Sequence, residues 1–245
     1  MTDAIVLTKR GYVGLMRLMR RVVSPFGLLE TPADIGKHRY RHWFQSLFAI
    51  YDTDELIRQD VPWWTYDAIA RVDRFLHERD RPLVFEYGSG ASTVWLARRA
   101  HRVISVDHDA FWAEQLQPRL AGLGNVTPML VPPDEVPDAD VRYHSHKPGY
   151  RGRSFKAYVE AIDRCPGDFD LIVIDGRARP ACLMKAVGRL ADDGMIVFDN
   201  SHRRHYQRAL GECGLNRTVT RGLVPSLPYP DQTTLLRPDK HSTGR

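Results

Sequence analysis

Val84-Phe85-Glu86-Tyr87-Gly88-Ser89-Gly90-Ala91-Ser92-Thr93 is the stretch of sequence that decides the fold. It passes from an apolar strand pattern through a glycine turn into a helix pattern. A second apolar run, Ile104-Ser105-Val106-Asp107, ends in a carboxylate 19 positions after Gly88. Glycines at such a turn let backbone N–H groups approach a ligand closely, and an acid ending the second strand can accept both hydroxyls of a ribose. The two runs therefore predict a βαβ unit that binds a nucleoside-containing ligand.

The residues around the glycines indicate which kind of nucleoside this is. A pyrophosphate site favours G-x-G-x-x-G, whereas this chain has Thr93 in place of the third glycine. Glu86 stands two residues before Gly88, where its charge would repel a pyrophosphate and attract a cation. S-adenosylmethionine carries a sulfonium and an ammonium group, so it is the ligand that we expect.

These motifs resemble those of the class I S-adenosylmethionine-dependent methyltransferases, in which E/D-x-G-x-G is the first motif and an acid ends the second strand. The resemblance implies that Glu86 meets the cationic amino-acid end of the cofactor and that Asp107 binds its ribose. The predicted cofactor-binding residues are Glu86, Gly88, Ser89, Gly90, Ser92, Thr93, Asp107 and His108. The alternative is a glycine turn in an ordinary α/β protein with no ligand.

Length and composition suit one α/β domain with an appendage. The chain has 245 residues, of which 43% are hydrophobic and 27% charged, and its formal net charge is +5. Three widely spaced cysteines favour a reduced, cytoplasmic setting. The chain has no uninterrupted run of 18 apolar residues, so no transmembrane helix is predicted.

The pattern along the chain predicts two parts. Residues 1–80 are expected to form a helical appendage, with helices at 4–22, 36–51 and 65–79, and residues 81–245 the cofactor-binding catalytic domain. The second part alternates β-branched runs with helical periods, which is typical of a Rossmann-like, doubly wound, mostly parallel sheet. The expected strands are 83–87, 102–106, 126–131, 169–175, 194–199, 216–221 and 232–236. Further helices are expected at 109–121, ending in a left-handed cap at Gly122 and Gly124, and at 180–191.

The N-terminal segment 4–23 is basic and contains no acid. Its apolar positions fit a helix that covers the catalytic domain while its arginines face water. The same positions also fit a basic amphipathic helix on an anionic membrane, peripheral at the inner face, or a targeting segment. The appendage as a whole could also serve as a substrate lid or as a contact between copies of the chain.

Polar residues at the ends of the fourth and fifth strands form the candidate chemical site. Asp175, Asp199 and Asn200 supply hard oxygen ligands of the kind that Mg²⁺ prefers. Their pattern is similar to that of metal-dependent O-methyltransferases of the catechol and caffeoyl-coenzyme A type, which implies a magnesium ion that activates a substrate hydroxyl. The lysine base of that type is absent, because Ala178 occupies its position. The catalytic candidates are His202, as the substitute base, Asp175 and Arg177.

Structural roles are open for the same residues. Asp175 could instead cap the helix near Pro180, and Asn200 the one near Arg203. Arg177 and Arg179 could pair with Asp175 or with other acidic neighbours. His202 could be a plain surface residue.

The segment between the third and fourth strands is cationic and aromatic, with no acid between residues 141 and 158. It fits a small-molecule or glycan acceptor that carries a phosphate, carboxylate or sulfate, and it equally fits an ordinary solvated basic loop. A nucleic-acid partner is disfavoured, since the net charge is modest and no RNA-binding module is visible. Trp43, Trp63, Trp64 and Tyr66 either wall the substrate pocket or belong to the core. Two other functions remain: a metal-independent N- or O-methyltransferase, and a non-catalytic protein of the same fold that docks on membranes or partners.

Overall fold

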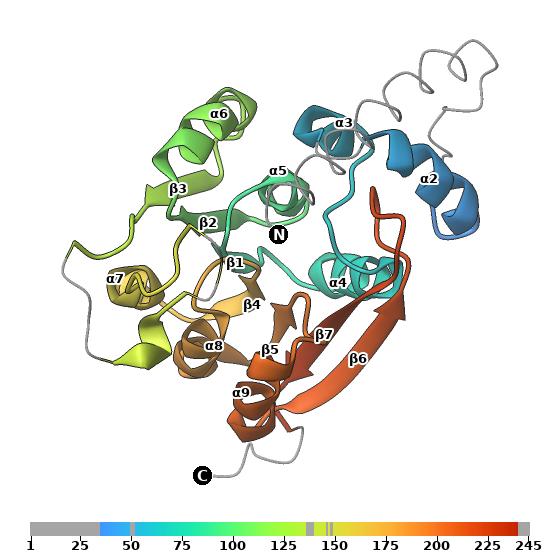
Figure 1. Ribbon diagram of the computed structural model, residues 1–245. Coiled ribbons are helices and arrows are strands. Elements are labelled where there is room, and N and C mark those ends of the chain that lie inside the picture. Colours follow the sequence, from blue (N-terminus) through green and yellow to red (C-terminus); the bar gives the residue numbers. More distant parts are fainter. Residues whose placement is uncertain (1–34, 50–51, 136–139, 146, 148, 240–245) are drawn as a thin grey trace, which may run out of the picture.

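The computed structural model describes residues 35–49, 52–135, 140–145, 147 and 149–239. They form a three-layer α/β structure, with a central sheet between two layers of helices (Figure 1). The sheet has seven strands in the order β3-β2-β1-β4-β5-β7-β6. The strands are β1 (Leu83–Tyr87), β2 (Arg102–Asp107), β3 (Val126–Leu130), β4 (Phe169–Ile174), β5 (Leu190–Phe198), β6 (Asn216–Gly222) and β7 (Asp231–Arg237).

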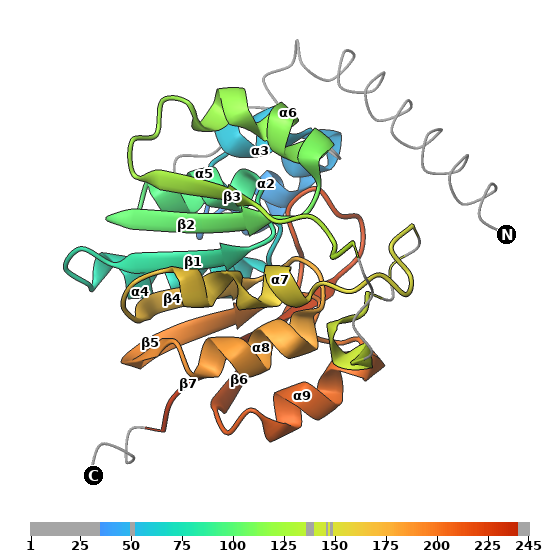
Figure 2. The ribbon, with the colours of Figure 1, turned by 90° about the vertical axis from the view of Figure 1, so that its left-hand side faces the viewer.

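Strand directions follow the predicted fold class. β1 to β5 are mutually parallel, and β7 runs antiparallel to both of its neighbours, β5 and β6. The carboxyl ends of β1, β2, β4 and β5 therefore meet at one edge of the sheet (Figure 2). The predicted seven-stranded, mostly parallel Rossmann-like sheet is confirmed.

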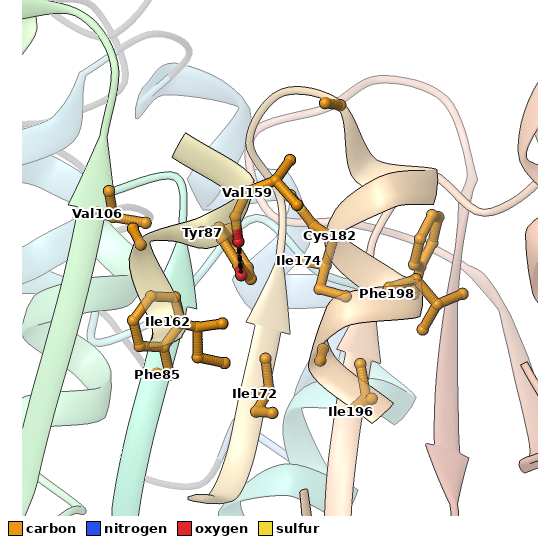
Figure 3. Packing of buried hydrophobic residues seen from close by; sticks show 14 of the residues in the cluster. Phe85, Tyr87, Val106, Val159, Ile162, Ile172, Ile174, Cys182, Ile196 and Phe198 are labelled. Carbon is orange, nitrogen blue, oxygen red and sulfur yellow. Dashed lines mark hydrogen bonds between the residues drawn. The ribbon is translucent and has the colours of Figure 1, made fainter. Parts of the chain in front are cut away.

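Alternation along the strands divides the core into two. Phe85 and Tyr87 of β1 face the layer made by α7 (Lys156–Val159), α8 (Arg179–Val187) and α9 (Gln207–Glu212) (Figure 3). Val84 faces the other layer, where α4 (Tyr66–His77) and α5 (Ala91–Ala97) pack. Because side chains alternate across a strand, Glu86 points towards α5 as well.

The remaining helices are short and lie around this frame. α6 (Ala110–Leu120) packs on α5 through Leu116 and Leu120. Short 3-10 turns, namely η2 (Leu47–Ala49), η3 (Val141–Tyr143), η4 (Glu160–Arg164) and η5 (Arg204–Tyr206), complete the described elements.

The described part of the appendage is fastened to the sheet domain. α2 (Arg39–Ser46) is held at the loop between β6 and β7, where Trp43 Nε1 donates to the carbonyl of Leu227 (2.8 Å) and Ser46 Oγ accepts from the N–H of Ser226 (2.8 Å). α3 (Thr53–Arg58) begins at Asp52, whose side chain caps it. The predicted helix 4–22, and all three interpretations of segment 4–23, fall on residues outside those described.

Several predicted boundaries were wrong. The helix expected at 36–51 spans only Arg39–Ser46, α3 was not predicted, and the helix expected at 180–191 ends at Val187. β5 begins at Leu190 rather than at 194, with an irregular register against β4. α6 has no left-handed cap, since Gly122 and Gly124 lack positive φ; the right-handed Ala121 leads into a tight turn instead.

In the parts of the chain covered by the structure, no helix is long and apolar enough to cross a lipid bilayer.

Candidate functional site

A cavity of about 1540 Å³ opens at the carboxyl ends of the parallel strands. This is where ligands bind in doubly wound sheets. Its lining includes residues 88–92 after β1, Asp107 and His108 after β2, Asp175 and Arg177 after β4, and Asn200 after β5. The sheet thus brings most of the predicted site residues to one space.

The floor of the cavity is a backbone-to-backbone contact between the loops after β1 and β4. Gly88 has φ +101°, and a Cβ on it would lie 2.8 Å from the backbone nitrogen of Gly176. A Cβ on Gly176 would lie 1.9 Å from Tyr158 Oη. Both glycines are therefore required by close approach, and Gly88 also by its left-handed backbone. Gly90 is different, because its backbone is extended and a Cβ would meet only Ser92 Oγ at 3.9 Å.

Asp107 is oriented by three backbone N–H groups. Its Oδ2 accepts from Ser89 (3.0 Å), and its Oδ1 accepts from His108 (2.7 Å) and Asp109 (3.0 Å). Each carboxylate oxygen can accept more than one hydrogen bond, and Asp107 lines the cavity. Trp112 Nε1 donates to the carbonyl of Ser89 (2.8 Å) and so ties α6 to the glycine loop. A carboxylate held in this orientation at the cavity, as Asp107 is, suits the two hydroxyls of a ribose.

Glu86 does not line the cavity, which corrects the prediction that it meets the cofactor directly. Its side chain is fully buried below the loop and accepts from Ser92 Oγ (2.5 Å), Thr93 Oγ1 (2.5 Å) and Ser105 Oγ (2.6 Å). Thr93 Oγ1 also accepts from the N–H of Gly90 (2.9 Å), and its side chain is buried. Glu86 and Thr93 therefore support the loop from beneath, whereas Ser92 reaches the cavity lining.

Burial raises the pKa of Glu86 from 4.5 to about 7, while the three hydroxyl donors act in the opposite direction. The carboxyl group is consequently not a full negative charge at neutral pH. The predicted attraction of a sulfonium by Glu86 loses much of its basis.

His108 and Arg177 form one wall of the cavity. Arg177 Nε donates to His108 Nε2 (3.1 Å), and His108 Nδ1 lies 3.1 Å from Asp107 Oδ1. The His108 ring packs against Tyr150 at 4.8 Å between centroids, and the Arg177 guanidinium lies 5.3 Å from the centroid of Tyr150. The predicted residues His108 and Arg177 are thus adjacent, and both lie beside the ring of Tyr150, a neighbour that the sequence did not predict.

The predicted magnesium ligands do not fit a metal ion. Arg179 Nη2 donates to Asp175 Oδ1 (2.5 Å), so a guanidinium stands where the cation would bind. Asp199 is buried and accepts from Thr233 Oγ1 (2.8 Å). Burial, and then the nearby Asp175, raise the pKa of Asp199 to about 8 in the absence of a metal ion. Among the described residues, no three His, Cys, Asp or Glu side chains gather as metal ligands.

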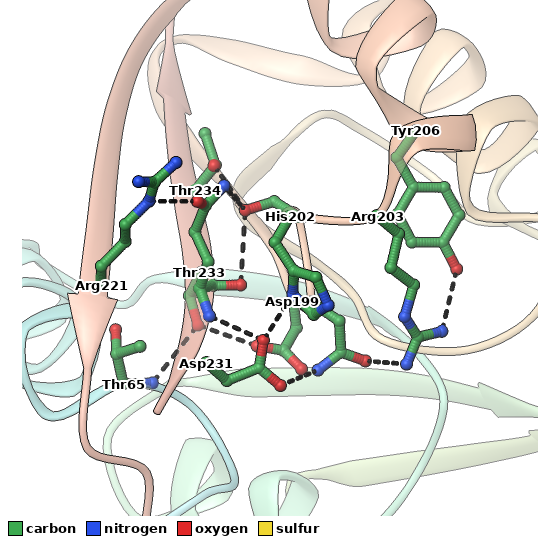
Figure 4. Close-up of polar contacts among 12 residues, drawn as sticks. Thr65, Asp199, His202, Arg203, Tyr206, Arg221, Asp231, Thr233 and Thr234 are labelled. Atoms are coloured by element: carbon green, nitrogen blue, oxygen red, sulfur yellow. Dashed lines mark hydrogen bonds and ion pairs between the residues drawn. The ribbon is translucent and has the colours of Figure 1, made fainter. Parts of the chain in front are cut away.

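The predicted base His202 is not among the residues that line the cavity. Its Nδ1 lies 2.8 Å from Asp231 Oδ1, and its side chain is half exposed (Figure 4). Asn200 lines the cavity, with its Nδ2 donating to Asp231 Oδ2 (3.0 Å) and its Oδ1 accepting from Arg203 Nη2 (3.0 Å). The capping alternatives are also wrong, because neither Asp175 nor Asn200 caps α8 or η5.

Sequence analysis missed several cavity residues. Arg203, His205 and Gly176 line the cavity, and none of them is among the predicted site residues. The available signal for Gly176 is its place shortly after the fourth strand, beside Asp175. Trp63 lines the cavity, whereas Trp64 is core.

Comparison with known proteins shows which solved structures share this fold. No protein-family model and no curated protein matches the chain. Among solved structures, cofactor-bound Rv0187 from MTB has a TM-score of 0.55 and 20% identity, covering 78% of this chain and 88% of that one. A methyltransferase-like protein from Silicibacter pomeroyi DSS-3 has a TM-score of 0.50 and 21% identity, covering 73% and 89%. Precorrin-6y C5,15-methyltransferase from Geobacter metallireducens GS-15 has a TM-score of 0.50 and 15% identity, covering 71% and 90%. These similarities, with the strand order, establish that the chain has the Rossmann-like fold of class I methyltransferases.

Proposed function

We propose that this protein is an S-adenosylmethionine-dependent methyltransferase that needs no metal ion and methylates an oxygen of a small molecule or glycan. The observation that carries the proposal is the shared cavity: the 88–90 loop and the Asp107 carboxylate face the same space, with Ser89 N 3.0 Å from Asp107 Oδ2. The fold supports it, since two of the similar structures are named as a methyltransferase-like protein and a methyltransferase.

The cofactor would supply the electrophilic methyl group, and this chain would bind the cofactor and the acceptor and orient them. Asp107 would accept the ribose hydroxyls, and the glycine loop would let the cofactor approach the backbone. Methyl transfer then depends chiefly on holding the acceptor atom in line with the methyl group. His144 and His205 line the cavity, and an imidazole there is our candidate base in place of His202.

Asp107→Asn should weaken binding of S-adenosylhomocysteine by about tenfold or more, because hydrogen bonds to a charged acceptor contribute about 1.5–3 kcal/mol. Calorimetric titration measures the affinity. Asp109→Asn is the matched control: Asp109 also lines the cavity, but its Oδ1 caps α6, a role that asparagine keeps. Equal affinities for Asp107→Asn and the wild type, with both proteins folded, would contradict the ribose assignment.

Exhaustive chelation should leave methyl transfer unchanged, because Arg179 already neutralises Asp175. The assay incubates the protein with labelled S-adenosylmethionine and fractionated cell extract, with and without EDTA. Loss of labelling with EDTA, and its return with Mg²⁺, would restore the metal-dependent hypothesis. Mass spectrometry of the labelled product tells an oxygen acceptor from a nitrogen acceptor. If S-adenosylhomocysteine does not bind at all, the non-catalytic alternative is favoured.

A further inference from the structure

The cations that line the cavity fall into two groups. Seven lysine and arginine side chains line it within the described part of the chain, and four are ion-paired. The pairs are Arg142 with Asp140, Arg179 with Asp175, Lys185 with Asp163, and Arg208 with Glu212. The other three, Lys147, Arg177 and Arg203, have no carboxylate at ion-pair distance among the described residues.

The two unpaired arginines are nevertheless held in place. Arg177 donates from Nε to His108 Nε2 (3.1 Å), and both of its terminal nitrogens are left without a protein acceptor among the residues described. Arg203 donates to the amide oxygen of Asn200 (3.0 Å) and lies 5.8 Å from the ring centroid of Tyr206 (Figure 4). Partners other than a carboxylate orient a guanidinium without neutralising it.

The charges around this group leave a positive excess. Lys147, Arg177, Arg179 and Arg203 all line the same cavity, and burial, followed by repulsion from the three arginines, lowers the pKa of Lys147. Of the carboxylates that act on these cations, Asp175 pairs with Arg179, and Asp107, which acts on Arg177, already accepts three backbone N–H groups. The partly buried Arg177 thus carries a desolvation cost that an anion would offset.

We propose that Lys147, Arg177 and Arg203 form a subsite for an oxyanion, a phosphate or carboxylate group carried by the methyl acceptor. The position of the subsite supports the acceptor rather than the cofactor. Arg203 follows β5, which lies on the far side of β1 and β4 from β2, the strand that carries Asp107. Assigning the anion to the acceptor rests on the proposed methyl transfer, whereas anion binding itself does not.

The test follows the arginine Nε signals by ¹⁵N NMR while inorganic phosphate or succinate is added at constant ionic strength. We expect saturable shifts of the Arg177 and Arg203 signals, and the anion that binds more tightly identifies the group. Arg203→Gln should weaken binding about fivefold or more, as expected for loss of one charge-assisted hydrogen bond. Arg208→Gln removes an ion-paired cation from the same lining and should change the affinity by less than about twofold.

The absence of saturable shifts with both anions would overturn the subsite, as would equal weakening by Arg203→Gln and Arg208→Gln. Calorimetry with S-adenosylhomocysteine separates the two possible owners of the anion. If Arg203→Gln weakens this ligand as much as it weakens phosphate, the cations serve the carboxylate of the cofactor, and the acceptor assignment fails. If the wild type binds phosphate but not S-adenosylhomocysteine, the subsite stands and the proposed function fails.

Discussion

Gly88→Ala should destabilise the fold by about 3–5 kcal/mol and abolish measurable binding of S-adenosylhomocysteine. The new Cβ would lie 2.8 Å from the Gly176 nitrogen and 2.9 Å from its Cα, and backbone atoms cannot rotate aside. In addition, φ +101° is a conformation that alanine adopts only at a cost. The loops after β1 and β4 must then separate, and a shift of about 1 Å in such a site can cost about 100-fold. Urea unfolding and calorimetric titration measure the two effects.

Substitutions at two further glycines separate the effect of backbone strain from the effect of the steric clash. Gly167→Ala introduces alanine at φ +75° with no atom within 4 Å, so it reports the backbone strain alone, about 1 kcal/mol. Gly90→Ala has neither strain nor clash, since its backbone is extended, and should leave stability within about 1 kcal/mol of the wild type. A Gly88→Ala protein no less stable than Gly167→Ala would show that the two loops are not in the contact described.

Sequence was a good guide to the sheet and to which segments meet at its edge. Strand runs such as Leu83–Tyr87 are apolar, end at glycine or acid, and alternate with helical periods, so their order along the chain was readable. β5 shows the limit. Its first residues, Leu190 to Asp193, include an exposed acidic pair that favours a turn, and of these four only Leu190 pairs with β4 before the register shifts. Gly122 shows a second limit of sequence-based prediction. Glycine permits a left-handed helix cap without requiring one, and Gly122 does not adopt a positive φ.

The site was predictable in position but not in pairing. A strand end tells which residues reach the edge, and Asp107, Arg177 and Asn200 all do. It does not tell whether a carboxylate faces a ligand or a neighbouring side chain. Arg179 pairs with Asp175, which lies four residues before it in the chain. From the sequence, this ion pair and a magnesium ion bound by Asp175 were both possible.

Glu86→Gln should change the pH dependence of stability by about 3 kcal/mol relative to the wild type. Burial raises the pKa of Glu86 from 4.5 to about 7, so between these values the folded protein keeps a proton that the unfolded chain has released. Wild-type stability therefore carries a contribution that is lost as the pH rises through this window. Glutamine does not titrate, and a shift of about 2.5 units corresponds to about 3 kcal/mol. Urea unfolding at pH 5 and pH 8 measures the difference.

Comparing variant with wild type is essential, because other buried groups titrate over the same range. Burial lowers the pKa of His42 to about 4, which makes stability rise with pH, whereas Asp199, raised to about 8, acts in the same direction as Glu86. Both are present in both proteins and cancel in the difference. Glu78→Gln, at an exposed position that follows α4, is the control substitution. If Glu86→Gln differs from the wild type by the same amount at pH 5 and pH 8, the hydroxyls of Ser92, Thr93 and Ser105 suffice to hold an ionised carboxylate. Glu86 would then be a fixed negative charge beneath the glycine loop, and its predicted attraction for a sulfonium would regain its basis.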